Sequence, residues 1–367
     1  MSLLPAILLL IVFLMGACQA APDPSIDQTP TQNAASAANE IAKLAYKQEA
    51  GIDNIMDEAE KSIFGVSERR ITRDLQTIQQ VISEVVERID LLSRRDEDTY
   101  GVPTGFIDLD KLLGGMQPSD FLIIAGRPGT GKTSFMLSAA KNAAQTHKKH
   151  VAIFSLEMSN EQLIQRLIAQ ETGIDSQRLR MGKLEEDDWP VFSHAVEVLG
   201  DTRIFLDDTP ALTPLQLRTK CRRLHMEWQL DLIIVDYLQL MSSGARAENR
   251  VQEVSYISRN MKVLARELNV PVLAAAQLSR AIEQRSDKEP QLSDLRESGS
   301  LEQDADVVMF ITRPELYDKD TTKKNLAQIK VAKHRNGPTG TIELVFLDQI
   351  AKFENAATRH IDLSQIG

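Results

Sequence analysis

The sequence has little cysteine, since Cys18 and Cys221 are the only two in 367 residues. A secreted scaffold held by disulfides needs more cysteines, and a zinc cluster needs several ligands at closer spacing. The sequence therefore excludes both, and it fits a reducing compartment. A hydrophobic fraction of 43% is ordinary for a globular protein that builds its core without covalent staples.

Positive charge is also in short supply, because 42 Lys and Arg face 52 Asp and Glu, for a net charge of -10. This balance is unlike that of a protein that binds nucleic acid or anionic membrane over its whole surface. A local basic surface stays open, especially one that several subunits build in a ring. Aromatic residues make up only 5% of the chain and are not interleaved with basic ones. Any nucleic acid is therefore expected to be held by its backbone rather than by base stacking.

Charged side chains are absent from residues 1–22, and residues 3–15 are almost entirely hydrocarbon. Such a segment fits a secretory signal, a lipoprotein signal with Cys18 as the lipidated residue, or a short membrane anchor. A sequence artefact, such as a misassigned start or a fusion of unrelated reading frames, is a further alternative. Residues 23–36, rich in Pro, Ala, Gln, Thr and Asp, predict a flexible linker. We expect a cytoplasmic protein, or a membrane-anchored one if residues 1–22 belong to it.

Helical patterns follow in residues 37–98. Residues 37–70 predict short helices that bury little surface by themselves. Residues 71–98 contain one stronger helix, in which apolar residues recur at spacings of three and four from Ile71 to Leu92. This apolar stripe packs either on its own domain or on a neighbouring subunit. The charged stretch 94–98 favours the second alternative, because it separates the helix from the globular part.

Strands and helices alternate over residues 99–360. The expected strands are the apolar runs 121–125, 151–156, 203–206, 232–235, 271–276 and 307–311, followed by a hairpin of 326–333 and 341–347. Helices are expected at 134–145, after Ser159, after Thr213 and at 251–268. This alternation predicts an α/β domain with a mainly parallel sheet.

The most informative motif is the Walker A loop, which directly follows the apolar run 121–125 and precedes a helix. Its residues are Gly126, Arg127, Pro128, Gly129, Thr130, Gly131, Lys132 and Thr133. In such a loop, backbone N–H groups cradle phosphates at a helix N-terminus. We therefore predict a nucleoside triphosphate site, in which Lys132 reaches the β- and γ-phosphates and the Thr133 hydroxyl holds Mg²⁺.

Three polar residues at strand ends are candidate partners of this loop. Asp236 ends the apolar run 232–235 in the Walker B pattern and is predicted to bind the Mg²⁺ shell. Glu157 could orient the attacking water if its strand lies beside the strand that precedes the loop. A solvated acid near a helix start is the alternative. Gln277 could sense the γ-phosphate or merely bond a loop.

Several motifs resemble those of the DnaB family of replicative DNA helicases. They lie at residues 104–110, 154–158, 235–240, 294–306 and 333–340, and the resemblance covers about residues 37–355. It implies a RecA-like P-loop NTPase core preceded by a helical linker segment. It also implies a homo-hexameric ring around single-stranded DNA that uses ATP and Mg²⁺ between subunits and unwinds duplexes in the 5′ to 3′ direction.

The resemblance also assigns roles to residues. Glu157 is implied as the catalytic base, and Gln277 as the link between nucleotide state and DNA. Lys333 and Arg335 are implied to reach the γ-phosphate held by a neighbouring subunit. Residues two apart on a strand share a face, so these two side chains are expected to point together. The alternative is a solvent-facing basic pair on an edge strand.

DNA contacts are implied for a loop that contains Arg296, Glu297 and Gly299, since Arg binds phosphate and Gly admits a close backbone N–H. Arg246 and Arg250 are weaker candidates. The family's N-terminal helical domain is matched only near residues 37–70, so binding of primase and of a helicase loader is an open expectation. Two alternatives to a helicase stay open: a RecA-like ring ATPase of the recombinase or clock type, and an inactive or regulatory truncated subunit.

Overall fold

The computed structural model describes residues 38–39, 42–43, 77–93, 101–244, 249–279, 282, 285, 289–298, 300–316 and 324–356. The chain divides into two units, residues 1–94 and residues 95–367. The segments predicted at 1–22 and 23–36, and most of 37–70, lie outside the described residues. Among the helices that the structure does describe, none is both long and apolar enough to span a bilayer.

In the first unit, the helix expected within residues 71–98 is present as α4 (Ile78–Ser93), and residues 71–76 lie outside the described part. Several apolar side chains of its stripe remain exposed within this unit: Ile78, Ile82, Val85, Val86 and Ile89. An apolar stripe of this kind needs a packing partner. That the partner is a neighbouring subunit stays a prediction.

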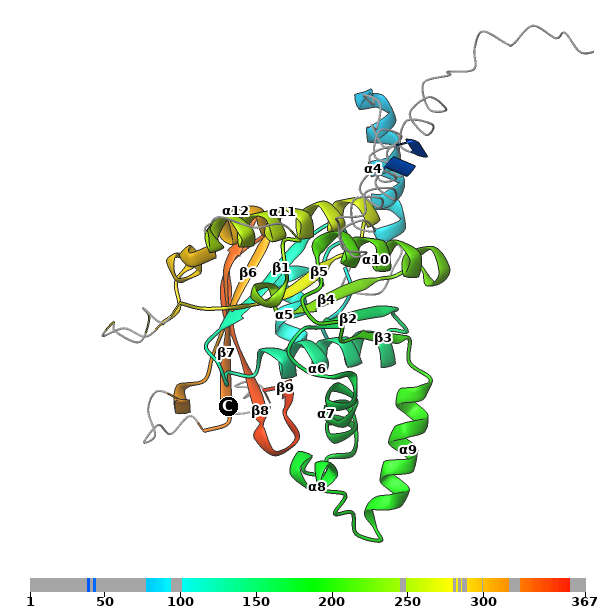
Figure 1. Ribbon diagram of the computed structural model, residues 1–367, viewed down its shortest axis with the longest axis vertical. Helices are drawn as coiled ribbons and strands as arrows, with labels where there is room; N and C mark the ends of the chain where they lie inside the picture. Colours follow the sequence, from blue (N-terminus) through cyan, green and yellow to red (C-terminus); the bar gives the residue numbers. More distant parts are fainter. Residues whose placement is uncertain are drawn as a thin grey trace, which may run out of the picture. The chain divides into compact units, whose positions relative to one another are not determined.

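The second unit is built on a nine-stranded sheet in the order β3-β2-β4-β5-β1-β6-β7-β8-β9 (Figure 1). The strands are β1 (Phe121–Gly126), β2 (Val151–Ser155), β3 (Ile204–Asp207), β4 (Leu232–Asp236), β5 (Val272–Gln277), β6 (Val307–Thr312), β7 (Leu326–His334), β8 (Gly340–Leu347) and β9 (Lys352–Asn355). Strands β1 to β6 pair in parallel, and β7 to β9 are antiparallel additions. The predicted α/β class with a mainly parallel sheet is confirmed.

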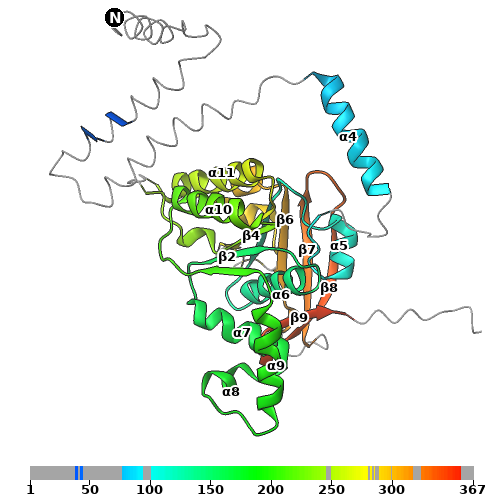
Figure 2. The ribbon, with the colours of Figure 1, turned by 90° about the vertical axis from the view of Figure 1, so that its right-hand side faces the viewer.

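Helices cover both faces of this sheet (Figure 2). The α-helices of the unit are α5 (Ile107–Leu113), α6 (Lys132–Gln145), α7 (Asn160–Thr172), α8 (Ser176–Arg180), α9 (Asp188–Gly200), α10 (Pro214–Trp228), α11 (Arg250–Leu268) and α12 (Leu301–Asp304). The 3₁₀ turns are η2 (Leu238–Leu240), η4 (Leu292–Ser298), η5 (Pro314–Leu316) and η6 (Asp348–Ile350). The sequence patterns did not predict α5, α8, α9, α12 or β9, which are short or lack a strong apolar period.

The side chains of β1 point alternately to the two faces of the sheet, so they contribute to two separate core layers. Leu122 and Ile124 pack with α6 and α7, whereas Phe121, Ile123 and Ala125 pack with α10 and α11. Burial on both faces explains why the parallel strands read as continuous apolar runs. Cys221 is a buried free thiol in the second of these layers, and Cys18 lies outside the described residues.

Helix starts at the strand ends follow the predicted capping. Ser159 and Gln162 form a reciprocal capping box at α7, and Thr213 and Gln216 form another at α10. Each box satisfies backbone N–H groups that a helix start leaves without partners. The α7 box fixes where β2 ends and the helix begins, and Glu157 lies in that turn.

Candidate functional site

The Walker A loop connects β1 to α6 and depends on two glycines with left-handed backbone. Gly129 has φ 79° and Gly131 has φ 97°, a region that residues with a side chain rarely adopt. A Cβ added at Gly131 would also lie 3.0 Å from Cε2 of Phe353. Gly131 is the N-cap of α6, so the helix begins at Lys132, two residues earlier than the apolar pattern indicated.

Lys132 lies at the start of α6 and folds back over the loop. Its Nζ donates to the carbonyl oxygens of Gly126 at 3.1 Å and Arg127 at 3.2 Å. Burial lowers the pKa of Lys132, and the nearby carboxylates of Asp236 and Glu157 oppose this shift. A cation under this desolvation is stabilised by an added anion, as a bound phosphate would be.

Thr133 and Asp236 meet directly across the gap between α6 and β4. The Thr133 Oγ1 donates to Oδ2 of Asp236 at 2.6 Å. Burial raises the pKa of Asp236, and the hydrogen bond from Thr133 opposes that rise. In the part of the chain that the structure describes, no group of three or more His, Cys, Asp or Glu could hold a metal. One hydroxyl and one carboxylate fit a Mg²⁺ ion that takes its other ligands from phosphates and water.

The strand register brings the predicted residues to one edge. Gly126 pairs with Gln277, and Ser155 pairs with Asp236, so the carboxyl ends of these four parallel strands lie at the same end of the sheet. A cavity of about 780 Å³ opens there. Its lining includes Pro128, Gly129, Gly131, Lys132, Thr133, Glu157, Asp236 and Gln277, among others. This is the crevice where open α/β sheets bind ligands.

Glu157 and Gln277 are held differently in this cavity. Glu157 is exposed in the turn before α7. Its strand does not lie beside β1 as expected, because β4 and β5 lie between β2 and β1, but Glu157 still lines the cavity. The backbone of Gln277 is clamped by Gln239, whose Oε1 accepts from the Gln277 N–H at 3.3 Å and whose Nε2 donates to the Gln277 carbonyl oxygen at 3.4 Å. The clamp uses backbone atoms, so the Gln277 side chain can face the cavity.

Two arginines that line the cavity were missed by the sequence patterns. Arg166 projects from α7, where burial lowers its pKa and the carboxylates of Asp236 and Glu157 oppose the shift. The sequence did contain one signal for Arg166: it lies seven residues after the Ser159 N-cap of α7, so the two residues lie on the same face of the helix. Arg313 follows β6 and lies over the Phe346 ring at 4.1 Å. It had no sequence signal, because β8 brings Phe346 to it only in the folded chain.

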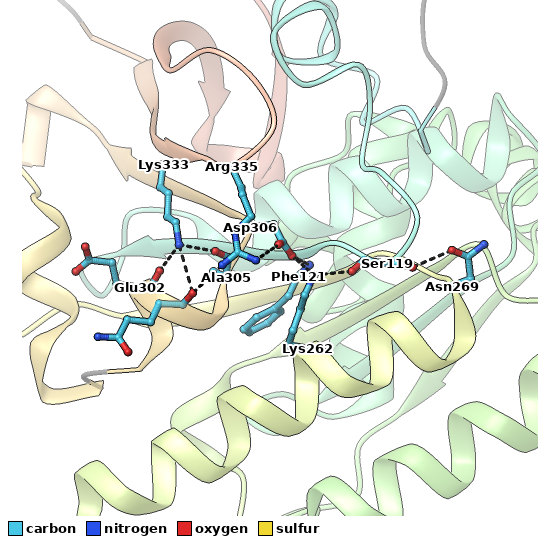
Figure 3. Close-up of polar contacts among 10 residues, drawn as sticks. Ser119, Phe121, Lys262, Asn269, Glu302, Ala305, Asp306, Lys333 and Arg335 are labelled. Carbon is cyan, nitrogen blue, oxygen red and sulfur yellow. Dashed lines mark hydrogen bonds and ion pairs between the residues drawn. The ribbon is translucent and has the colours of Figure 1, made fainter. Parts of the chain in front are cut away.

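Lys333 and Arg335 lie at the opposite end of the sheet, toward the amino ends of the parallel strands. Lys333 pairs with Val308, and Val308 pairs with Ile123, so Lys333 is level with the third residue of β1. Gly126 ends that strand three residues later, roughly 10 Å away. The two side chains point toward the same segment, residues 302–306, as expected (Figure 3). The alternative of an edge strand is wrong, because β7 lies between β6 and β8.

The predicted DNA loop is only partly described. Arg296 and Glu297 belong to η4, with side chains outside the described atoms, and Gly299 lies outside the described residues. Arg246 also lies outside them. Arg250 begins α11, where it forms an ion pair with Glu253 and donates to the carbonyl oxygen of Gln239.

Asp120 lies at the same end of the sheet as Lys333 and Arg335, and its buried negative charge is unfavourable for folding. Burial, and next the negative charge of Asp306, raise the pKa of Asp120 to about 6, although Lys262 and other cations oppose the rise. Because this pKa is above the ordinary value of 3.8, the folded state binds the proton more tightly than the unfolded state. The group therefore costs stability progressively as pH rises from about 4 to about 6, and the cost is complete above that range.

The variant Asp120→Asn is expected to unfold at a temperature a few degrees higher than the parent at pH 8, with a smaller gain at pH 5. Thermal unfolding followed by circular dichroism at both pH values measures this difference. Asp108→Asn is the matched control, since Asp108 is exposed on α5. A gain that is equal at the two pH values would contradict the assigned titration.

Comparisons with known proteins agree with this geometry. The family described as DnaB-like helicase C terminal domain matches residues 101–355. The chain is 47% identical over 330 residues to the replicative DNA helicase DnaB of Geobacillus stearothermophilus, covering 90% of this chain and 72% of that protein. It is also 47% identical over 326 residues to the replicative DNA helicase DnaC of Bacillus subtilis, covering 89% and 72%.

Solved structures give the same result for the fold. One solved ATPase domain aligns with a TM-score of 0.74 at 37% identity, covering 77% of this chain and 100% of that one. A DnaB-like replicative helicase studied with primase aligns with a TM-score of 0.75 at 33% identity, covering 89% and 76%. The predicted RecA-like core is thus confirmed. Both kinds of comparison show that the chain belongs to the DnaB-like family of ATP-dependent replicative DNA helicases.

Proposed function

We propose that this chain works as a homo-hexameric ring that moves along single-stranded DNA and hydrolyses ATP between subunits. The observation that carries the proposal is that the expected catalytic residues are divided between the two ends of the parallel strands. The cavity holds the Walker A loop, Glu157 and Asp236, whereas Lys333 and Arg335 lie at the other edge. A site that needs both sets is completed only when a second chain docks.

In this proposal each residue of the cavity has one task. Lys132 neutralises the β- and γ-phosphates, and its desolvated ammonium gains most from that contact. Glu157 accepts a proton from the attacking water, which it orients toward the γ-phosphate. Thr133 and Asp236 would hold Mg²⁺, which supplies charge neutralisation at the phosphates when bound.

Arg335 and Lys333 of the neighbouring chain would stabilise the charge that develops on the transferred phosphoryl group. Gln277 ends β5, next to the Walker A strand, and would report the state of the γ-phosphate to the rest of the chain. Hydrolysis would then depend on ring assembly, because no single chain carries a complete site.

For DNA, we propose contacts from Arg296, Glu297 and Gly299 to the phosphate backbone. Such contacts give affinity without sequence preference, and binding should weaken as salt rises. We also propose that the protein acts in the cytoplasm and that primase and a helicase loader are partners. Support for the primase partner comes from a similar solved structure, which describes a DnaB-like replicative helicase and its interactions with primase.

The chain is expected to unwind a forked duplex with a 5′ single-stranded tail in the presence of ATP and Mg²⁺, and Lys132→Ala is expected to abolish unwinding. The reason is that the variant loses the cation that holds the phosphates. Strand separation followed by gel electrophoresis measures this, with light scattering for the hexamer. Lys111→Ala is the matched control, because Lys111 is exposed on α5.

Other outcomes would favour the alternatives. Strand exchange or autophosphorylation without unwinding would point to a recombinase-type or clock-type ATPase. If the parent and Lys132→Ala are equally inactive and no hexamer forms, the motor function fails for this chain.

A further inference from the structure

The edge opposite the nucleotide cavity is organised by one buried carboxylate, Asp306. Its side chain is only 4% exposed. Its Oδ2 accepts from the backbone N–H of Phe121 at 2.8 Å and from Nζ of Lys262. Its Oδ1 accepts from Nη1 of Arg335 at 3.2 Å, and its carbonyl oxygen accepts from the Arg335 N–H at 2.9 Å (Figure 3).

Arg335 is thus anchored at two points and open elsewhere. Its side chain is 50% exposed, so one part of the guanidinium faces Asp306 and the rest faces solvent. Hydrogen bonds between a guanidinium and a carboxylate are among the stronger ones in proteins. Asp306 is itself held by Phe121 of β1 and Lys262 of α11, so it gives Arg335 a rigid base.

Lys333 holds the same segment from its other side. Its Nζ donates to the carbonyl oxygens of Glu302 at 2.6 Å and Ala305 at 2.7 Å. These carbonyls lie at the end of α12, where a helix leaves acceptors without intrahelical partners and favours a cation. Nη2 of Arg335 also donates to the carbonyl oxygen of Gln303 at 3.3 Å.

The segment held in this way continues directly from the proposed DNA loop. Residues 296–299 precede α12 (Leu301–Asp304), a single helical turn about 6 Å long. Leu301 is fully buried and fixes this turn against the core that contains α11. Leu295 of η4 is buried in the same core, so a displacement of η4 has a short, packed path to the carbonyls that Lys333 and Arg335 hold.

We propose that Asp306 is a positioning residue, which holds Arg335 on the carbonyl end of α12 and so ties this arginine and Lys333 to the DNA loop of the same chain. DNA contact in one subunit then sets the arginine that this subunit offers to its neighbour's nucleotide. The inference rests on the proposed function, in which Arg335 acts in trans. An ion pair with a purely structural role would stabilise the fold without this directional effect.

Rings mixed from two full-length variants test the proposal. One chain carries Arg335→Ala and keeps its Walker A loop; the other carries Lys132→Ala and keeps Arg335. Co-expression with two different tags isolates the mixed rings. ATP is then hydrolysed only where the first chain's loop meets the second chain's arginine, so each chain has one defined task.

Asp306→Asn is placed in either chain in turn. In the chain that donates Arg335, it is expected to lower kcat about 10- to 100-fold with KM for ATP unchanged, as a small misplacement of a catalytic group does. The loss should be absent when the same substitution lies in the other chain, whose Arg335 is already gone. A folding defect would lower activity whichever chain carried Asp306→Asn. Equal losses in the two kinds of ring would therefore overturn this inference but leave the proposed function standing.

The DNA link is tested in the same rings with a single-stranded oligonucleotide. Arg296→Ala in the chain that donates Arg335 is expected to remove the stimulation of hydrolysis by DNA. Full stimulation in those rings would overturn the coupling. The mixed rings of Arg335→Ala and Lys132→Ala chains, without any further substitution, are the reference. If they form but do not hydrolyse ATP, the trans role of Arg335 is wrong, and the inference fails together with that part of the proposed function.

Discussion

Glu157→Gln is expected to slow ATP hydrolysis by about two to four orders of magnitude while ATP binding persists. Glu157 follows β2, lines the cavity that contains Lys132 and Asp236, and is exposed to the solvent that would supply the attacking water. Gln keeps the length and the hydrogen-bonding capacity of the side chain, but it cannot accept the proton. The substitution therefore isolates the chemical step.

Two measurements check this result: the steady-state hydrolysis rate with saturating single-stranded DNA, and the affinity for a fluorescent ATP analogue. Glu161→Gln is the matched control, because Glu161 lies in the first turn of α7, outside the residues that line the cavity. Hydrolysis within a few-fold of the parent would mean that another group accepts the proton. A parallel loss of binding would instead make Glu157 a binding residue.

Arg335→Ala is expected to lower hydrolysis by about 10³-fold or more without preventing hexamer formation. In the proposed ring, the neighbouring chain supplies this group, because Arg335 follows β7 at the end of the sheet opposite the Walker A loop. Its half-exposed guanidinium can face a neighbour while Asp306 anchors it. Alanine removes the charge and leaves the P-loop of the same chain intact.

Hydrolysis assays and light scattering on the same sample measure the two parts of this prediction. Arg223→Ala is the matched control, since Arg223 is an exposed arginine on α10. Mixing Arg335→Ala chains with Lys132→Ala chains should restore part of the activity, because each supplies what the other lacks. Normal hydrolysis by Arg335→Ala rings would show that the site is complete within one chain.

Local patterns were sufficient to predict much of the site. The glycines of the Walker A loop are required by local backbone geometry, and Asp236 is recognisable because a buried strand ends there. The capping boxes at Ser159 and Thr213 fix two helix starts through contacts three residues apart. Such contacts depend on neighbours in the chain, so they can be read without the fold.

Other features depended on residues far apart in the sequence. Arg313 meets Phe346, and Asp306 meets Phe121, Lys262 and Arg335, across separations that no local pattern encodes. The short strand β9 exists because it adds to β8.

By itself, the sequence determined the Walker A loop, the alternation of strands and helices, and the identity of the residues that carry charge. Only the tertiary structure decided which of these residues share a site. The strand order β2-β4-β5-β1 gathers Glu157, Asp236, Gln277 and the Walker A loop at one edge. The antiparallel return of β7 carries Lys333 and Arg335 to the other edge. The physical reason is that hydrogen-bonded pairing sets strand order and direction, and pairing joins segments that lie far apart in the chain.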